Sequence, residues 1–510
     1  MAAWPDAVTF ARCWADAVAR RTDATFLVFE APDGTTTSWT YDEFDSVVAR
    51  MATELSSHEV GPGATVHLAL TNCPTFVAVW LAAIRLGAAI VPSDPMGRTP
   101  ELADHIERTS PSVGFCARDR AAEYRPAIGS TPVFEIDEGD AELAWLPVDE
   151  FTDWPQPDVR DRAAVMFTSG TTGRPKGVEV TQANYAFAGK VMAEAAALTA
   201  DDRQLVVLPL FHANAQYYSF ASAIWAGASV ALMHTFSASG FLEQAARHRA
   251  TCASLFAAPM RMILARGGPV DGVRLRHCWF AQNITADQYT TLTEWFGCRP
   301  RQLYGMTETI PAVLTDEAAD PVGNLMGRVT PGCEVAIHDP SGCAVAPGEV
   351  GEIVVRGERG ITLFAGYLDD EQTTRVGIRG GWFQTGDRAT RDPSGRFAFV
   401  GRRSDILKVA GENVSTIEIE AVVSSHPAVL EASVVGAPDP IRDEVPVAFV
   451  VPVDAAAPPA IDELEAWCSE RLGKAKVPRA FTLLDELPRT SVGKIRTFML
   501  KESAMKEHAP

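Results

Sequence analysis

The stretch of sequence that decides the fold is Val165-Met-Phe-Thr-Ser-Gly-Thr-Thr-Gly-Arg-Pro-Lys-Gly-Val178. The apolar run over residues 163–167 predicts a buried strand. The residues after it are mostly glycine, threonine and serine, and Lys176 follows them. Glycines let backbone N–H groups approach an anion, hydroxyls donate hydrogen bonds, and lysine adds positive charge. The pattern favours a polyphosphate loop over a plain exposed turn. It is not the Walker pattern, because no Ser or Thr follows the lysine.

The bulk composition limits the classes of protein to which the chain can belong. Its 510 residues are too many for one ordinary core, so two or more domains are expected. The net charge of −20 disfavours nucleic acid or an anionic membrane as the main partner. Nine cysteines without a Cys-x-x-Cys pair favour reduced thiols and a cytoplasmic location. We expect no signal peptide and no membrane span, since Arg85 and Gly87 interrupt the longest apolar stretch.

Helix-like and strand-like patterns alternate along the large N-terminal part of the chain. They predict an α/β fold whose large N-terminal domain, residues 1–400, has parallel-rich sheets flanked by helices, plus a β-barrel-like subdomain. Asn72, two residues before Pro74, is expected to cap a helix. Residues 130–158 are expected to form an irregular connection. After residues 401–404 the composition changes, which predicts a small α+β C-terminal domain, residues 401–510.

The order Thr-Ser-Gly-Thr-Thr-Gly-x-Pro-Lys-Gly, residues 168–177, resembles the phosphate loop of the adenylate-forming superfamily. That superfamily includes acyl-CoA synthetases, adenylation domains of peptide synthetases and luciferases. Four further stretches resemble the superfamily in the same order, so the likeness covers nearly the whole chain. They are residues 304–309, 381–387, 404–420 and 488–496. The resemblance implies that the C-terminal domain is mobile.

The resemblance also implies an ATP and Mg²⁺ site. Tyr304 would pack on adenine, Thr307 would reach the α-phosphate, and Glu308, with Thr168, would hold Mg²⁺, which prefers hard oxygen ligands. Asp387 would accept the ribose hydroxyls and Arg402 would contact ribose or phosphate. Taken alone, each of these short motifs is as compatible with a capped turn as with a nucleotide site. The implied ATP-binding residues are Thr168, Ser169, Gly170, Thr171, Thr172, Gly173, Lys176, Tyr304, Gly305, Met306, Thr307, Asp387 and Arg402.

The C-terminal motifs imply a reaction in two halves. By resemblance, Lys494 bridges the acid's carboxylate and the α-phosphate during adenylation. Ser404 stands at the hinge, where the family usually has Asp or Lys, and a hinge needs backbone freedom more than a given side chain. A thiol channel would form later from Lys408, Gly411 and Glu412. The catalytic residues implied in total are Lys494, Lys176, His212 and Glu308.

The implied acyl pocket contains His212, Asn214, Tyr217, Gln282 and Asn283. Relatives that activate amino acids have Asp where this chain has His212, so an α-amino acid is disfavoured. The polar character of the pocket favours a small or polar acid. The segments around residues 304–310 and 411–415 resemble the branch of carnitine and crotonobetaine–CoA ligases.

We therefore predict an AMP-forming acid–thiol ligase. It would convert a carboxylic acid and ATP into an acyl-adenylate and pyrophosphate, then transfer the acyl group to coenzyme A. The alternative is a stand-alone adenylating enzyme that passes the activated group to a carrier protein or another nucleophile, as in nitrite activation for diazo formation. A non-catalytic binding module is disfavoured, because the implied catalytic residues are intact. Either a monomer or a homodimer is compatible with the sequence.

Overall fold

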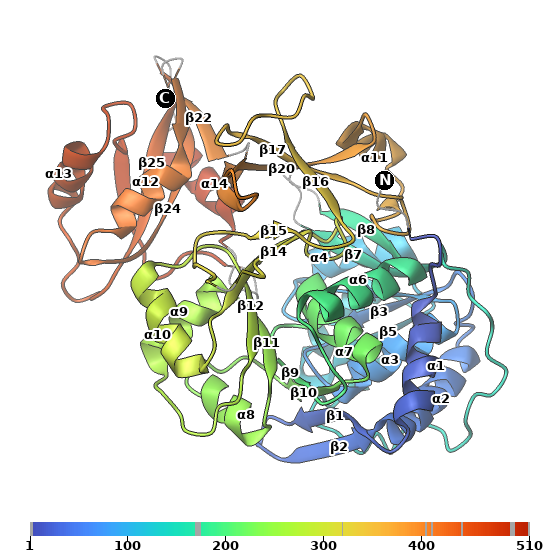
Figure 1. Ribbon diagram of the computed structural model, residues 1–510. Helices are drawn as coiled ribbons and strands as arrows, with labels where there is room; N and C mark the ends of the chain where they lie inside the picture. Colours follow the sequence, from blue (N-terminus) through green and yellow to red (C-terminus); the bar gives the residue numbers. More distant parts are fainter. Residues whose placement is uncertain are drawn as a thin grey trace.

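The computed structural model describes residues 4–168, 175–318, 320–402, 405–409, 412–439, 442–489 and 495–507. It has the mixed α/β architecture that was predicted, with a large N-terminal part and a small C-terminal part (Figure 1). Within the described residues the strands form four sheets. Two large, mostly parallel sheets fill the lower half of Figure 1, and the C-terminal sheet stands at the upper left.

The first large sheet has nine strands in the order β15-β14-β13-β12-β11-β9-β10-β1-β2. Its six central strands are parallel, and antiparallel strands close both edges. The bounds are β1 (Thr25–Glu30), β2 (Thr36–Thr40), β9 (Arg203–Val206), β10 (Ser229–Met233), β11 (Cys252–Phe256), β12 (His277–Ala281), β13 (Arg301–Tyr304), β14 (Leu314–Thr315) and β15 (Arg328–Val329).

The second large sheet has seven strands in the order β18-β8-β7-β4-β3-β5-β6. Strand β6 lies inside residues 130–158, so the expectation of an irregular connection there is wrong in part. The backbone of β6 pairs in parallel with β5 and extends the sheet edge. The bounds are β3 (Thr65–Ala69), β4 (Ala89–Pro92), β5 (Val113–Ala117), β6 (Val133–Ile136), β7 (Arg162–Thr168), β8 (Lys176–Thr181) and β18 (Gly366–Tyr367).

The main hydrophobic core lies between these two sheets and includes the helices that are packed between them. Helix α3 is buried on all sides there, which explains its nearly continuous apolar sequence. The core helices are α1 (Phe10–Arg21), α2 (Tyr41–Ser57), α3 (Pro74–Arg85), α6 (Gln182–Ala195), the π-helix η2 (Asn214–Ala221) and α7 (Ser222–Ala226). Two outer layers complete the N-terminal part: α8 (Phe241–Arg247), α9 (Ala257–Arg266) and α10 (Ala286–Phe296) on the first sheet, and η1 (Arg118–Arg120), α4 (Thr99–Thr109) and α5 (Ala121–Ile128) by the second.

Asn72 ties the two large sheets together. Its buried amide donates to the carbonyls of Leu208 and Met233, at 3.1 and 3.0 Å, and accepts from the backbone N–H of Leu210 at 2.8 Å. The expected role as a helix cap is therefore wrong. Cys73 occupies the N-cap position of α3, and its side chain makes no capping hydrogen bond. The Asn72 side chain instead satisfies backbone groups beyond the carboxyl ends of β9 and β10, which would otherwise be buried without partners.

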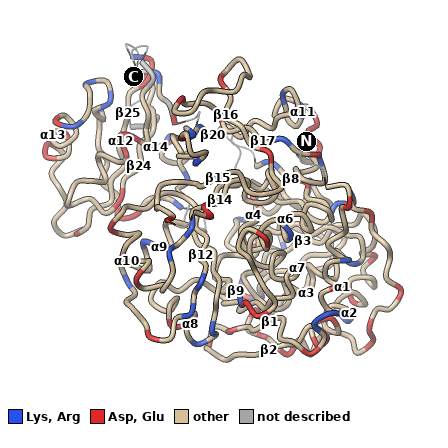
Figure 2. Tube along the Cα trace, in the orientation of Figure 1, with Lys and Arg blue, Asp and Glu red and all other residues tan. Residues whose placement is uncertain are grey.

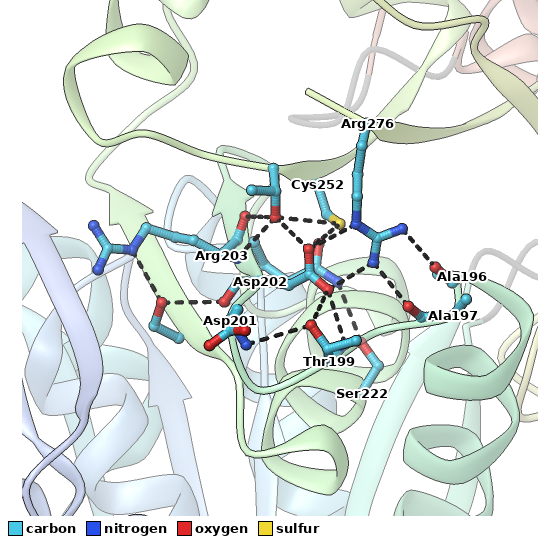
Figure 3. Close-up of polar contacts among 12 residues, drawn as sticks. Ala196, Ala197, Thr199, Asp201, Asp202, Arg203, Ser222, Cys252 and Arg276 are labelled. Atoms are coloured by element: carbon cyan, nitrogen blue, oxygen red, sulfur yellow. Dashed lines mark hydrogen bonds and ion pairs between the residues drawn. The ribbon is translucent and has the colours of Figure 1, made fainter. Parts of the chain in front are cut away.

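At the opposite end of the first sheet, Asp202 fixes the start of β9 against its neighbours. Its carboxylate accepts hydrogen bonds from Thr199, Thr251 and Arg276, and Figure 3 shows the Arg276 guanidinium between Asp202 and two backbone carbonyls. Burial acts to raise the pKa of Asp202, but the hydrogen bonds, led by that of Arg276, outweigh it and hold the pKa at about 2. The network sets where β9, β11 and β12 begin, and so where their carboxyl ends lie.

The two smaller sheets come from the last third of the chain. An antiparallel sheet of β16 (Glu334–His338), β17 (Gly351–Arg356), β19 (Ile378–Arg379), β20 (Trp382–Arg391) and β21 (Phe397–Arg402) is joined by helix α11 (Glu371–Gly377). The last sheet contains β22 (Ile406–Val409), β23 (Glu412–Ser415), β24 (Val429–Asp439), β25 (Asp443–Pro452) and β26 (Ala480–Leu483), with α12 (Thr416–Ser424), α13 (Ile461–Arg471) and α14 (Thr497–Glu507). It has hydrophobic clusters of its own.

Charged residues lie mostly on loops and outer helix surfaces, and the central strands hold few of them (Figure 2). Acidic and basic residues are interspersed along the chain in this view, although acidic residues are more numerous in the sequence. In the part of the chain that the structure describes, no helix has the length and apolar character required to cross a membrane.

Replacing Asn72 by alanine should destabilise the N-terminal part by about 3 kcal/mol, because buried backbone groups lose their partners. Calorimetry should show a lower thermal midpoint than for the wild type. Asn324→Ala removes an exposed asparagine and serves as the matched control. Equal midpoints for the two variants would contradict the bridging role of Asn72.

Candidate active site

The predicted phosphate loop connects the two strands of a β-hairpin. Strands β7 and β8 are antiparallel, and Thr168 is the register partner of Lys176. The Thr168 hydroxyl also donates to the Lys176 carbonyl at 3.4 Å. The hairpin fixes both ends of the loop, and it places Lys176 at the base of the loop. The other predicted loop residues lie outside the described residues; they are Ser169, Gly170, Thr171, Thr172 and Gly173.

Helix α4 braces both ends of this loop. Arg108 donates to the carbonyl of Pro175 at 2.8 Å, and its guanidinium lies over the ring of Phe167 at 4.8 Å. The ring of His105, one turn earlier, stacks on Phe167 with centroids 3.8 Å apart and planes 7° from parallel. Phe167 is the penultimate residue of β7, and Pro175 precedes β8. No pattern in the sequence indicates this contact, because Arg108 is distant from both residues along the chain.

The neutral histidines behind the loop belong to a buried hydrogen-bonded chain. The Ser93 hydroxyl contacts Nδ1 of His105 at 2.8 Å and Nε2 of His67 at 3.0 Å, and His67 Nδ1 contacts the Tyr124 hydroxyl at 2.7 Å. Burial lowers the pKa of His105 to about 4 and that of His67 to about 3. Both rings are therefore uncharged near neutral pH, and they add no positive charge beside the loop.

Three predicted nucleotide residues meet at one carboxylate. The buried side chain of Asp387 accepts a hydrogen bond from the Tyr304 hydroxyl at 2.7 Å and another from Arg402 Nε at 2.9 Å. Tyr304 ends β13 of the first sheet, whereas Asp387 and Arg402 are register partners on β20 and β21. The charge of Asp387 raises the pKa of Arg402, which keeps the guanidinium ionised. Each carboxylate oxygen keeps a lone pair that could accept a ligand hydroxyl.

A second buried carboxylate, Glu308, lies beside the loop strand. It accepts a hydrogen bond from the Tyr367 hydroxyl at 3.0 Å, and the Lys176 ammonium lies over the Tyr367 ring at 4.7 Å. Burial raises the pKa of Glu308, and hydrogen bonds and nearby positive charges only partly oppose this effect. The Glu308 carboxylate is thus buried, with a neutral tyrosine donor and with Lys176 nearby.

Tyr367 was not predicted as a site residue. It lies on the short strand β18, which pairs with β8, the strand that follows the loop. In this pairing Tyr367 is the register partner of Val178. No motif in the sequence distinguishes this tyrosine, because its position depends on pairing between distant parts of the chain. Gly177 precedes Val178 on β8. An added Cβ at Gly177 would come within 3.1 Å of Leu368 and 3.0 Å of Val165. Close packing thus favours a glycine before Val178.

The residues around Glu308 suit a magnesium ion that is shared with phosphates. A buried carboxylate oxygen is a hard ligand, and Mg²⁺ commonly takes only one or two carboxylates and completes its shell with phosphate oxygens and water. Thr168, the other predicted ligand, is half-buried at the end of β7. The donor set therefore fits the ion, which would neutralise phosphate charge when bound.

The residues predicted for the acyl pocket come from two places. His212 precedes the π-helix η2, which begins at Asn214, and π-helical turns are frequent at functional sites. Asn214 and Tyr217 are buried, and the Tyr217 hydroxyl contacts Met166 Sδ of β7 at 3.7 Å. The second place is the turn after β12. Gln282 there has an exposed side chain and a φ of 75°, and the side chain of Asn283 accepts from Gln302 at 2.9 Å.

The segment 304–308, which follows strand β13, is closely packed against these pocket residues. Met306 donates its backbone N–H to the Thr309 hydroxyl at 2.9 Å, and Thr307 is half-buried beside it. An added Cβ at Gly305 would come within 2.7 Å of the Tyr218 hydroxyl. The segment 304–308 therefore contacts η2 directly, so the predicted nucleotide and acyl residues adjoin.

The remaining predicted residues lie in the C-terminal part. Lys408 on β22 has an exposed side chain, and its backbone N–H donates to Glu444 at 2.9 Å. Glu412 begins β23. The C-terminal part faces helix α9, because Arg261 on α9 interacts electrostatically with Arg489 and Glu431. Three predicted residues lie outside the described ranges; they are Ser404, Gly411 and Lys494.

Nearly the whole chain matches known proteins. Residues 14–368 match the AMP-binding enzyme family, and residues 418–494 match the AMP-binding enzyme C-terminal domain. The crotonobetaine/carnitine–CoA ligase of Salmonella paratyphi B is 33% identical over 500 residues, which cover 94% of this chain and 96% of the relative. The o-succinylbenzoate CoA synthetase of Bacillus subtilis, solved with ATP and magnesium, superposes with a TM-score of 0.82 at 28% identity, covering 96% of this chain and 98% of that one.

A more distant structure shares the fold over the full length. The anthranilate CoA ligase solved with anthranoyl-AMP superposes with a TM-score of 0.87 at 24% identity, covering 99% of each chain. Together the matches extend over both the N-terminal and C-terminal parts.

Arg108→Met should raise KM for MgATP about tenfold, because the charge-assisted hydrogen bond to the Pro175 carbonyl, beside Lys176, is lost. Steady-state kinetics should show a much smaller change in KM for the acid. Arg108→Lys should restore part of the affinity. Arg125→Met, which breaks an exposed ion pair with Glu135, is the matched control. An equal rise in KM for every substrate would indicate a general structural role instead.

Glu308→Gln should lower the adenylation rate by on the order of a hundredfold, as loss of a preorganised charge typically does. Because burial raises the pKa of Glu308, acidification protonates this carboxyl earlier than an ordinary glutamate. The Mg²⁺ concentration needed for half-maximal activity should therefore rise in the wild type as the pH is lowered. Protonation of ATP itself affects the wild type and the Glu308→Gln variant equally, so a difference between the two reports on Glu308. If the glutamine variant shows the same pH dependence, Glu308 is not the titrating ligand.

Proposed function

The chain belongs to the AMP-binding enzyme family and acts as an ATP-dependent acid–thiol ligase, and we propose how its residues divide the reaction. The observation on which the proposal rests is a pair of buried carboxylates at the two ends of the segment 304–308: Asp387, which contacts Tyr304, and Glu308 itself. One is held by Tyr304 and Arg402, as a ribose acceptor requires. The other lies beside Lys176, as a phosphate and magnesium site requires.

The first half-reaction makes the acid a better electrophile. A carboxylate resists attack because its leaving group would be oxide. When a carboxylate oxygen attacks the α-phosphorus of ATP, the bond to the pyrophosphate oxygen breaks, and the acyl-adenylate forms with AMP as a good leaving group. Such a transfer depends on positioning and charge neutralisation more than on covalent help from the protein. Lys176 and Glu308 with its ion would serve the phosphates, and Lys494 would bridge carboxylate and α-phosphate.

The nucleotide would be held at its other end by Asp387. Its carboxylate is already oriented by two donors, so binding the ribose hydroxyls requires no rearrangement of the side chain. Arg402, always charged, would contact ribose or phosphate from the end of β21. Tyr304, almost fully buried, would provide a flat surface for adenine. Thr307 would reach the α-phosphate from the half-buried position beside Glu308.

In the second half-reaction the thiol of coenzyme A would attack the acyl carbon and release AMP. We propose that residues 401–510 form the domain that turns about Ser404 between the two halves. The turn would withdraw Lys494 and bring the hairpin with Lys408, Gly411 and Glu412 to the site as a thiol channel. Coenzyme A is favoured as acceptor because the relatives matching 94% of this chain are named CoA ligases. We also propose a cytoplasmic location.

The second candidate is an adenylating enzyme whose acceptor is a carrier protein or another nucleophile. Mass spectrometry separates the two. Reactions with MgATP, a panel of small, aromatic and medium-chain acids or nitrite, each with and without coenzyme A, should give AMP together with an acyl-CoA. AMP or a retained adenylate, with no CoA adduct from any acid, would favour the second candidate.

Lys494→Ala should slow adenylate formation by on the order of a hundredfold, because the charge that joins the two anionic reactants is lost. Thioester formation from chemically supplied acyl-AMP should be much less affected. The two half-reactions are measured separately by pyrophosphate release and by acyl-CoA formation. Lys506→Ala, which removes an exposed lysine on α14, is the control. Equal loss of both half-reactions in a folded variant would contradict the two-state scheme.

A further inference from the structure

The buried polar groups that lack hydrogen-bond partners among the described residues include four atoms on three side chains of β11, β12 and η2. These groups are both amide atoms of Asn214, the hydroxyl of Ser254 and the indole nitrogen of Trp279. Their residues are 5%, 4% and 2% exposed, so bulk solvent does not satisfy them. A buried polar group without a partner costs roughly 1–3 kcal/mol, so such a group requires an explanation, such as a bound ligand or an ordered water.

Two of the three groups are neighbours on the first large sheet. Ser254 on β11 and Trp279 on β12 are register partners, so their side chains leave the sheet on the same face. That face also bears Gln204, whose register partner is Cys252, two residues before Ser254. Gln204 donates to the Ser222 hydroxyl at 3.4 Å, which shows that η2 and α7 cover this face.

Asn214 lies on the side of η2 that faces the same surface. Residues four apart lie on roughly the same side of η2 and of α7, which continues it, so Asn214, Tyr218 and Ser222 follow one stripe. Ser222 on this stripe contacts Gln204 of the sheet, and the Tyr218 hydroxyl lies against Gly305. The stripe therefore runs from the sheet surface to the segment where the acid must meet ATP.

We propose that the acid carries an uncharged oxygen function, a hydroxyl or a carbonyl, besides its carboxylate, and that Asn214, Ser254 and Trp279 bind this oxygen. The inference rests on the proposed function, since it concerns the acyl part of the same site. An oxygen function is the class of group selected, because the indole N–H of Trp279 can only donate and therefore requires an acceptor. The amide and hydroxyl can donate to the same oxygen or accept from its hydrogen.

The same chemistry disfavours two other classes of acid. A quaternary ammonium group, such as the one in crotonobetaine, offers no hydrogen-bond acceptor and would leave the indole N–H of Trp279 unpaired. A plain hydrocarbon chain would leave all three groups unpaired, and this penalty is what allows a polar site to reject an apolar analogue. Of the two acids that name the Salmonella relative, crotonobetaine lacks this oxygen and is disfavoured, whereas carnitine bears a hydroxyl.

The test compares acids that differ by one oxygen. Butanoate is paired with 3- and 4-hydroxybutanoate, pentanoate with 4-oxopentanoate, and benzoate with 2- and 4-hydroxybenzoate, and crotonobetaine is added. The acid with the highest kcat/KM should bear the extra oxygen and exceed its hydrocarbon match by about tenfold or more. A hydrocarbon acid or crotonobetaine as the best substrate would overturn the proposal. It would also be overturned by equal values within each pair, as expected if water alone fills the site.

Near-isosteric variants assign the effect to these residues. Trp279→Phe keeps an aromatic ring and removes the donor, and Ser254→Ala removes one hydroxyl. In each, the ratio of kcat/KM between the oxygen-bearing acid and its match should fall about fivefold or more, as expected for loss of one hydrogen bond. Trp145→Phe, on a partly buried tryptophan packed against Phe134, is the matched control. An unaltered ratio in both folded variants would overturn the assignment.

A failure of the underlying function would look different. If no acid of the panel released AMP from MgATP, with or without coenzyme A, the proposed ligase function would be contradicted, and this inference with it. If AMP is released but the preference within the acid pairs is absent or reversed, only the inference about the substrate class fails.

Discussion

The buried carboxylate of Asp387 is the interaction on which the arrangement of the site depends. It joins Tyr304 at the end of a strand of the nine-stranded sheet to Arg402 at the end of the antiparallel sheet, two elements that are distant in the sequence. A buried carboxylate without donors would be strongly destabilising, so the two donors must come together for the protein to fold as it does. The contact that stabilises the junction is also the one that orients the carboxylate oxygens proposed to bind the ribose.

An acidic protein must bind a polyphosphate, and local structure resolves this conflict. The net charge of −20 is spread over the surface, whereas Lys176, Arg108 and Arg402 are brought to the site from three different elements. Buried histidines near the loop stay neutral and do not add to this charge. Charges at a partly buried site interact more strongly than those on the surface, so a few of them suffice.

The fold class and the buried strand before the glycine-rich loop could be predicted from apolar runs and turn residues. The departures share one cause. Asn72 has the sequence signature of a helix cap, but its side chain instead satisfies backbone groups of a distant segment. Strand β6 has a weak sequence pattern and exists because β5 offers an edge to pair with. In both cases a tertiary hydrogen bond prevailed over the local preference.

The sequence by itself determined the residue types of the chemistry, which are a glycine-rich loop with its lysine, two carboxylates in separate motifs, and an arginine near the domain boundary. These could be recognised because charge and backbone freedom are properties of the residues themselves. Only the tertiary structure decided that Tyr367 and Arg108 belong to the site. It also decided that Ser254 and Trp279 lie side by side on one face of the sheet and that Asn214 is buried. Their positions depend on strand pairing and helix packing across long stretches of chain, which no local pattern encodes.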